Sequence, residues 1–203
     1  MISVIDYGVC NLGSMLNMLH KVGAQAELIS TPAEVERAEK IVLPGVGAFD
    51  NGIAALRDRG LAEPLRKKAL NDRVPLLGVC LGMQMLGRRS EEGSMNGLGL
   101  VDAEVRRFRM PPGSGLKVPH MGWSLLVPHR DSALLHTLDE RSRFYFCHSY
   151  RMFCNDPDDI LATANHGGDF VAMVQRENIY GVQFHPEKSH RFGMSLLHNF
   201  ARI

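Results

Sequence analysis

A cysteine held between two glycines is the side chain of this sequence best suited to chemistry. The letters G-V-C-L-G at residues 78–82 follow an apolar run and lead directly into an apolar, helix-like segment. A nucleophile on a sharp strand-to-helix turn needs this layout, because the crowded turn leaves no room for Cβ atoms beside it. The positive end of the following helix also favours the thiolate of Cys80. The alternative is a buried structural cysteine in an ordinary strand-turn-helix.

A pair of residues later in the chain could supply the proton transfers that a cysteine nucleophile requires. A thiolate attacks a carbonyl carbon best with a base beside it and a group that orients the base. Among nine histidines, His185 has Glu187 two positions later, and the pair directly follows an apolar, strand-like run. In an extended segment both side chains leave the same face, and Pro186 stiffens the pair. Alone, the two could be surface neighbours; with the glycine-flanked cysteine they predict a catalytic Cys80, His185 and Glu187.

The elements that must hold these residues alternate in the first half of the chain. Short apolar strands and helices follow each other, which predicts a parallel sheet with helices on both faces. Ligands of such sheets bind beyond the carboxyl ends of the strands, where the cysteine lies. Asn11 is expected to cap the first helix. Strands are predicted at residues 2–5, 26–29, 40–43 and 74–79, and helices at 12–22, 31–38 and 51–71, the last broken at Gly60.

After residue 87 the pattern changes to strand-like runs between loops. It predicts mixed or antiparallel β structure that completes the molecule. The expected fold class is therefore α/β, with a mostly parallel central sheet and helices on both faces. No repeat or long linker divides the chain, so residues 1–203 are expected to form a single domain. The β runs lie at residues 99–108, 122–127, 143–150, 160–165, 170–176 and 179–184, and a final amphipathic helix at 192–200.

Composition argues against several function classes. The net charge is +1 with mixed signs, which disfavours a nucleic-acid partner. No apolar run approaches the roughly 20 residues of a membrane span, and the N-terminus shows no secretory signal. The four cysteines lack C-x-x-C spacing, which is typical of reduced thiols rather than of a zinc site or a disulfide framework. We therefore expect a cytoplasmic protein without membrane contact, metal or cofactor.

Motifs spread over the whole chain resemble those of a known enzyme family. G-V-C-L-G-M-Q at residues 78–84 and F-H-P-E at 184–187 are similar to class I, or triad, glutamine amidotransferases, whose fold is flavodoxin-like. Narrower matches resemble the glutaminase subunit of imidazole glycerol phosphate synthase, in the right order from residue 2 to the end. They are D-Y-G at residues 6–8, P-G-V-G-A-F at 44–49, P-H-M-G-W at 119–123 and F-Y-F-C-H-S-Y at 144–150.

The resemblance implies hydrolysis of L-glutamine to glutamate and ammonia. Cys80 would attack the side-chain amide to give a glutamyl thioester. His185 would take the thiol proton and pass it to the departing ammonia, while Glu187 would orient the imidazole.

The resemblance also implies which groups surround the reacting amide. Positioned backbone N–H groups must stabilise the oxyanion, and the candidates are those of Leu81 and of Val46 or Gly47. The amino-acid end of the substrate would be held by three further side chains, which are otherwise ordinary residues of a helix and a strand. They are Gln84, Ser149 and Tyr150.

The length of the chain implies that the ammonia is used on another polypeptide. A (β/α)8 barrel takes about 250 residues, and no G-x-x-x-x-G-K-[ST] phosphate loop occurs here. The resemblance implies a heterodimer with a cyclase barrel that makes imidazole glycerol phosphate and AICAR in histidine biosynthesis, with ammonia passing through the barrel. His120, Met121 and Trp123 are the expected partner contacts, although Trp123 could equally pack in the core. Turnover is expected to be low without the partner.

Two positions depart from the family pattern. Cys10 stands where glycine is usual, and Ser124 stands where asparagine usually follows M-G-W. They leave open a paralogous glutaminase that feeds a different synthase, such as a surface-polysaccharide sugar amidotransferase. A cysteine peptidase or γ-glutamyl hydrolase would share the cysteine and histidine but would not need residues 119–123. A catalytically silent binding subunit is the third alternative, which the presence of all three catalytic residue types disfavours.

Overall fold

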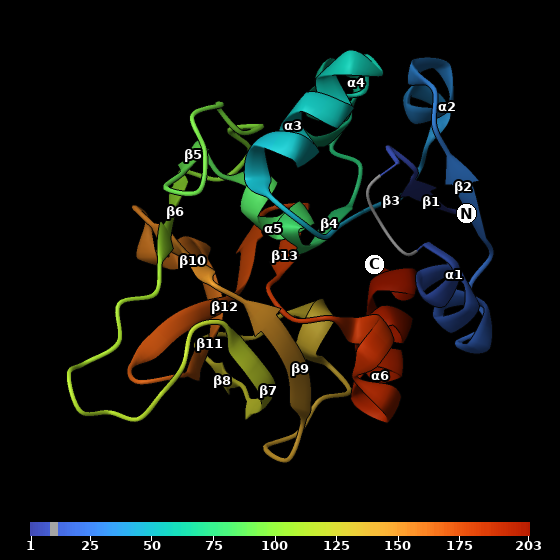
Figure 1. The fold of residues 1–203 in the computed structure, drawn as a ribbon. Coiled ribbons are helices and arrows are strands. Elements are labelled where there is room, and N and C mark those ends of the chain that lie inside the picture. The colour runs from blue at the N-terminus through green and yellow to red at the C-terminus, as the bar shows by residue number, and fades with distance from the viewer. Residues whose placement is uncertain (9–11) are drawn as a thin grey trace.

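The computed structural model describes residues 1–8 and 12–203, so the expectations for Cys10 and Asn11 lie outside the described residues. The predicted parallel sheet is present and its strand order is β2-β1-β3-β4-β13 (Figure 1). Each neighbouring pair in this set runs parallel. The strands are β1 (Ile2–Ile5), β2 (Ala26–Ile29), β3 (Ile41–Gly45), β4 (Leu76–Cys80) and β13 (Ile179–Val182).

Helices cover both faces of this sheet, as predicted. Alternation along β3 explains why: Leu43 packs into one apolar core, while Val42 packs into the other. The first core contains residues of α2 (Pro32–Arg37), α3 (Phe49–Asp58), α4 (Ala62–Leu70) and α5 (Leu81–Leu86). The second contains residues of α1 (Leu12–Lys21) and α6 (His190–Arg202), which Figure 1 shows on the opposite side from α3 and α4. The predicted α/β class is confirmed.

Local signals set the helix boundaries. Thr31 accepts a hydrogen bond from the N–H of Glu34, and the Glu34 carboxylate accepts one from the N–H of Thr31, which starts α2 with a capping box. Gly60 has φ of +68°, a conformation that side chains with a Cβ rarely adopt. It therefore separates α3 from α4, and the predicted break at this residue is confirmed.

The second half of the chain extends the sheet with antiparallel strands. β12 (Asp169–Arg176) pairs with β13, and β10 (Tyr150–Cys154), β6 (Ala103–Arg107) and β5 (Arg89–Ser90) follow, with only β5 and β6 parallel. β11 (Ile160–Asn165) lies between β12 and β8 (Val127–Pro128). β7 (His120–Leu125) and β9 (Arg143–His148) form a separate ribbon. Short 3₁₀ turns occur at η1 (Ala133–Leu135), η2 (Pro157–Asp159) and η3 (Pro186–Lys188).

One predicted strand is divided in the structure. The run expected at residues 143–150 breaks at Ser149, because β9 pairs with β7 whereas β10 pairs with β6 and β12. The apolar pattern of the sequence cannot show that two halves of one run belong to different sheets. The break matters for function, since it places Ser149 at the carboxyl end of the parallel strands rather than inside a ladder.

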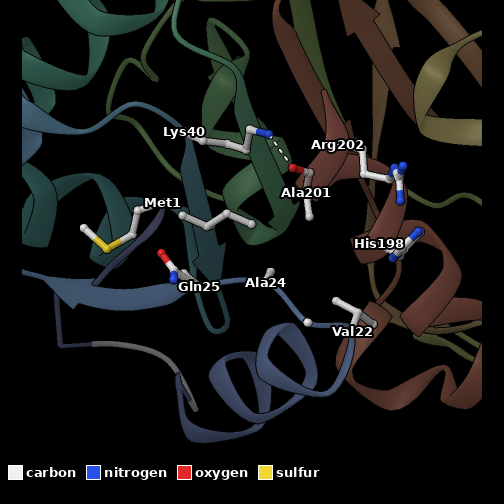
Figure 2. A pocket seen from close by; sticks show the side chains of 10 residues that line it. Met1, Val22, Ala24, Gln25, Lys40, His198, Ala201 and Arg202 are labelled. Carbon is white, nitrogen blue, oxygen red and sulfur yellow. Dashed lines mark hydrogen bonds between the residues drawn. The ribbon is translucent and has the colours of Figure 1, made fainter.

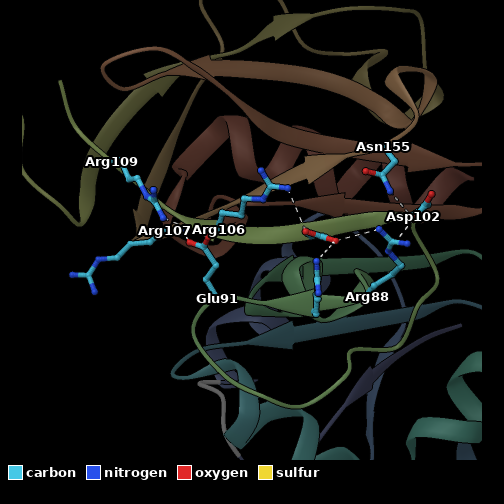
Figure 3. Close-up of polar contacts among 9 residues, drawn as sticks. Arg88, Glu91, Asp102, Arg106, Arg107, Arg109 and Asn155 are labelled. Carbon is cyan, nitrogen blue, oxygen red and sulfur yellow. Dashed lines mark hydrogen bonds and ion pairs between the residues drawn. The ribbon is translucent and has the colours of Figure 1, made fainter.

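The edge of the sheet at β5 and β6 carries a cluster of charged side chains. The carboxylate of Glu104 lies 2.9 Å from Arg89 and 3.3 Å from both Arg88 and Arg106 (Figure 3). The hydrogen bond to Arg89 is the strongest influence holding the pKa of Glu104 below its ordinary value. Charges along an edge strand disfavour pairing with a second chain. Among the described residues, no helix combines the length and apolar character needed to cross a bilayer.

Candidate active site

The turn between β4 and α5 holds Cys80 in a strained backbone conformation. Its φ is +55° and its ψ is −109°, a combination that residues with a Cβ rarely adopt. A Cβ on Gly82 would lie 1.8 Å from the carbonyl oxygen of Leu43, and one on Gly78 would lie 2.8 Å from the backbone of Gly82. Gly82 is therefore required by the close approach of α5 to β3, and Gly78 by the close approach of β4 to α5, as the sequence pattern predicts for a nucleophile on a sharp turn.

Strand register brings the other predicted segments to this cysteine. Gly45 at the end of β3 pairs with Cys80, so the P-G-V-G loop that follows β3 begins beside the sulfur. On the other side of β4, Val182 pairs with Val79, so the segment after β13 reaches the same edge. Helix α5 has only six residues, so its effect on the thiolate comes from the N–H groups of one turn.

His185 and Glu187 lie together beside the cysteine. Nδ1 of His185 is 2.7 Å from Oε1 of Glu187, and His185 is almost fully buried. The pair was expected on an extended segment directly after a strand, and this was wrong for Glu187. β13 ends at Val182, His185 is extended, and Pro186 starts the 3₁₀ turn η3 that contains Glu187. Proline is favoured in the first turn of a helix, and Pro186 starts this turn. The turn brings the carboxylate of Glu187 back to the imidazole of His185.

The charges around His185 favour its protonated form. Burial acts to lower the pKa of the imidazole, but hydrogen bonds to Cys80 and Glu187, together with their negative charges, raise it to about 10. Because Nδ1 is engaged by Glu187, Nε2 is the nitrogen left for Cys80. An imidazolium next to a thiolate is the charge state in which a cysteine nucleophile is activated.

These groups open into a cavity of about 430 Å³ at the carboxyl ends of the parallel strands. It contains the predicted oxyanion candidates Leu81, Val46 and Gly47, and the predicted substrate contacts Gln84, Ser149 and Tyr150. A small polar amino acid fits such a volume. The remaining lining residues are Cys80, Glu92, Pro119, Cys147, His148, His185 and Lys188.

Three polar residues at the site were missed by the sequence analysis. Glu92 lies in the loop after β5, where its carboxylate accepts a hydrogen bond from the N–H of Phe49 at 2.9 Å. Lys188 lines the cavity from η3. Gln183 is fully buried, and its amide nitrogen is 3.8 Å from Sγ of Cys80. The charge of Glu92 in a predicted loop was the only feature of the sequence that could have marked it as a site residue. Nothing in the sequence showed which loop would lie beside the cavity.

Sequence comparison identifies the family. The class I glutamine amidotransferase profile matches residues 3–203. The chain belongs to this family. This amidotransferase is therefore an enzyme that hydrolyses glutamine, and the resemblance read from its motifs is confirmed.

Curated relatives of this amidotransferase extend over its full length. It is 52% identical over 203 residues to the imidazole glycerol phosphate synthase subunit HisH 2 of Pseudomonas aeruginosa, with all of both chains covered. It is 46% identical over 202 residues to subunit HisH 2 of Methanococcus maripaludis, covering 100% of this chain and 99% of the relative. Subunit HisH of Bdellovibrio bacteriovorus is 47% identical over 204 residues, again over all of both chains.

Solved structures agree with the fold of this amidotransferase. PurLQS from Thermotoga maritima superimposes with a TM-score of 0.74 at 18% identity, covering 99% of this chain and 97% of the other. The glutaminase domain of Trypanosoma brucei CTPS with bound acivicin superimposes with a TM-score of 0.64 at 15% identity, covering 99% of this chain and 93% of the other. At such identities the likeness concerns the fold.

The predicted partner contacts on β7 divide between two faces. Met121 and Trp123 point outward and are 61% and 43% exposed, and Leu125 continues the same row. We call these three residues the β7 stripe. Trp123 also stacks on His190, with ring centroids 5.5 Å apart, so it is neither buried in the core nor free of contacts. His120 belongs to the opposite face and is buried, so its expected role as a surface contact was wrong: alternation along the strand turns it inward.

A second cavity lies at the amino ends of the parallel strands, between the start of β1 and the end of α6 (Figure 2). Its volume is about 390 Å³, and Lys40 and Arg202 line it. Lys40 donates a hydrogen bond to the carbonyl of Ala201 at 2.8 Å. The Lys40 ammonium group therefore serves as a hydrogen-bond donor to the last turn of α6. Within the described part of the chain, no group of three or more His, Cys, Asp or Glu side chains is arranged to hold a metal ion.

Proposed function

We propose that this chain is the glutaminase subunit of an imidazole glycerol phosphate synthase and acts in histidine biosynthesis. It releases ammonia from L-glutamine and delivers it to a separate cyclase subunit. The observation that carries this proposal is the meeting of Cys80 and His185 in one cavity, with Glu187 hydrogen-bonded to the imidazole, in a chain that matches such subunits from end to end.

The proposed reaction runs in two halves. The Cys80 thiolate attacks the carbonyl carbon of the side-chain amide, and the oxyanion is held by the N–H of Leu81 with that of Val46 or Gly47. His185 donates its Nε2 proton to the departing nitrogen, the carbon–nitrogen bond breaks, and a glutamyl thioester remains. Water then attacks the thioester, gives a proton to His185, and releases glutamate and the thiolate.

The amino-acid end of glutamine requires polar partners at the other end of the cavity. We propose that Gln84, Ser149 and Tyr150 provide them, which the lining of the cavity supports. Glu92 adds a negative charge that suits the ammonium group of the substrate.

We propose that the β7 stripe docks a (β/α)8-barrel cyclase in a heterodimer. Exposed apolar residues in a row mark an interaction surface rather than solvent-facing structure. The whole of residues 1–203 would act as one glutaminase domain, and ammonia would pass through the barrel without entering solvent. We infer a cytoplasmic location, which the free thiols of Cys80, Cys147 and Cys154 support.

The alternative acceptors are less favoured. A glutaminase for a surface-polysaccharide synthase would share the site, but the full-length relatives named above are subunits of imidazole glycerol phosphate synthases. A peptidase or γ-glutamyl hydrolase would act without any partner.

The test compares initial rates of glutamate release by the chain alone and with the cyclase subunit carrying its ligand. We expect a rate increase of at least about tenfold with the loaded partner, and labelling of Cys80 by an electrophilic glutamine analogue. Equal rates would overturn the coupling, and labelling at another residue would overturn the site. Isolation of the partner from the source cell separates the two pathways, because its acceptor substrate identifies the synthase.

A further inference from the structure

A buried pair of histidines that the triad does not use reaches the wall of the cavity, which His148 lines. His120 on β7 and His148 on β9 occupy paired positions of the ribbon, and Nδ1 of His120 is 3.2 Å from Nε2 of His148. Phe108, Phe146 and Phe170 surround the two rings. Both histidines are almost fully buried, so each polar atom in the pair must find a partner within the protein.

The hydrogen bonds of this pair can run in only one direction. Burial lowers the pKa of His120 to about 4 and that of His148 to about 3, so both rings are neutral at pH 7 and each has one N–H and one lone pair. Nδ1 of His148 lies 2.7 Å from the carbonyl oxygen of Tyr150, which can only accept, so Nδ1 carries the proton. Nε2 of His148 must then accept from Nδ1 of His120. The remaining nitrogen of His120 must accept from the hydroxyl of Ser124, 3.1 Å away.

The same carbonyl continues the network toward the nucleophile. The carbonyl of Tyr150 also accepts a hydrogen bond from Nε2 of Gln84 at 3.2 Å. Nε2 of Gln84 donates its other hydrogen to Oε1 of Gln183 at 2.9 Å. With its oxygen engaged, the Gln183 amide presents N–H rather than C=O to Sγ of Cys80, at 3.8 Å.

We call this network the Ser124–Cys80 chain, after its two ends. Its members come from β7, β9, β10, α5, β4 and the segment after β13. In order they are Ser124, His120, His148, the Tyr150 carbonyl, Gln84, Gln183 and Cys80. The network has two arms that converge on the Tyr150 carbonyl, which accepts from His148 on one side and from Gln84 on the other. Within each arm every bond has one allowed donor and one allowed acceptor, so reversing one bond would leave two donors or two acceptors facing each other.

We propose that the Ser124–Cys80 chain is a positioning network that locks the Gln183 amide with its N–H toward the Cys80 sulfur and so favours the thiolate. The proposal rests on the proposed role of Cys80 as nucleophile. An N–H group beside the sulfur stabilises negative charge, whereas a carbonyl oxygen in the same place would repel it. Ser124, His120 and His148 act through their neighbours. Gln84 takes part through its amide N–H groups, in addition to its proposed contact with the substrate, and among these residues Gln183 is the one that touches the sulfur.

The outer end of the network lies on the strand that carries the β7 stripe. Ser124 and His120 face inward from the same strand on which Met121 and Trp123 face outward. Other titratable groups near the two histidines are His166, whose ring stacks 4.2 Å from that of His120, and His185. Positive charge on His166 disfavours protonation of both histidines, and positive charge on His185 disfavours protonation of His148, which keeps the network in its neutral form.

The first experiment measures alkylation of Cys80 by iodoacetamide against pH in the full chain, with Cys80 followed by peptide mass spectrometry. We expect Gln183→Leu to slow alkylation at pH 7 by about three- to tenfold and Ser124→Ala by about two- to threefold, from the loss of one hydrogen bond in each case. Ser124→Asn, which restores a donor, should recover the normal rate. Thr163→Val is the matched control, because Thr163 makes a hydroxyl–imidazole contact with His129 outside the network.

Normal alkylation by both Gln183→Leu and Ser124→Ala would overturn the proposal, and so would a failure of Ser124→Asn to restore the rate. The second measurement needs no variant: ¹⁵N NMR of the imidazoles should show both His120 and His148 neutral and protonated at Nδ1. Protonation at Nε2 in either ring would contradict the direction of the network. Alkylation requires neither glutamine nor a partner, so an expected alkylation result without glutamine hydrolysis would reject the proposed function alone.

Discussion

Nδ1 of His185 lies 2.7 Å from Oε1 of Glu187, and the buried carboxylate is the partner that holds the imidazole in one orientation. Glu187→Gln keeps the shape but removes the negative charge that supports the imidazolium. We expect kcat for glutamate release, measured with the cyclase partner, to fall at least about 100-fold, because the orienting acid of a triad also sets the tautomer of its histidine.

The matched control for this variant is Glu63→Gln, which removes an exposed carboxylate paired with Arg66. It should leave kcat unchanged, since exposed ion pairs contribute little. Activity of Glu187→Gln within twofold of the wild type would show that Glu187 does not orient the base.

The close approach of Gly82 to β3 predicts a large stability effect. A Cβ at this position would lie 1.8 Å from the carbonyl oxygen of Leu43, and neither backbone segment can move without disturbing the turn at Cys80. We expect Gly82→Ala to lower the free energy of unfolding in urea by about 3 kcal/mol or more. Gly23→Ala is the control: Gly23 has φ of +80° but no atom within 4 Å of the added Cβ, so the loss should be about 1–2 kcal/mol. Equal losses would rule out the steric explanation.

The buried histidines predict that the fold loses stability in acid. The folded-state pKa of His148 is about 3, below its ordinary value of 6.5, so the unfolded chain binds the extra proton between these values. The contribution of neutral His148 to the free energy of unfolding is therefore complete above pH 6.5 and is lost as the pH falls toward 3. At pH 5 the loss from His148 is about 2 kcal/mol relative to pH 8, at 1.36 kcal/mol per pH unit.

The measurement is the difference in unfolding free energy between pH 8 and pH 5 for wild type and His148→Gln. The variant should lose about 2 kcal/mol less than the wild type over this interval, whatever its stability at pH 8. His20→Gln, at an exposed histidine near the end of α1, should follow the wild type. An unchanged acid loss in His148→Gln would refute the prediction.

The β7 stripe predicts where the partner binds. Trp123 is 43% exposed and can lose its side chain without opening the core, so Trp123→Ala should leave the isolated chain nearly as stable. We expect the Kd for the cyclase subunit to rise at least about tenfold, because exposed tryptophans in apolar patches often dominate binding. Leu28→Ala, at an exposed apolar residue on the edge strand β2, is the control and should not change Kd. Unchanged affinity of Trp123→Ala would place the interface elsewhere.

Several features were predictable from the sequence because they depend on short stretches. The glycines around Cys80 reflect a local clash, the break at Gly60 reflects one backbone angle, and the capping box at Thr31 joins residues three apart. The parallel sheet followed from strands that alternate with helices. The division of residues 143–150 between two sheets was missed, because which strands pair depends on residues far away in the chain.

The sequence by itself determined the residue types of the site, the α/β class and the edge of the sheet where the reacting groups gather, since periodicity and turn residues act locally. Only the tertiary structure decided which side chains meet. It curled Glu187 back onto His185, turned His120 away from the surface, and brought Gln183 within reach of the Cys80 sulfur. Such contacts join residues up to about a hundred positions apart, and they depend on how the strands align and which faces of the elements are buried.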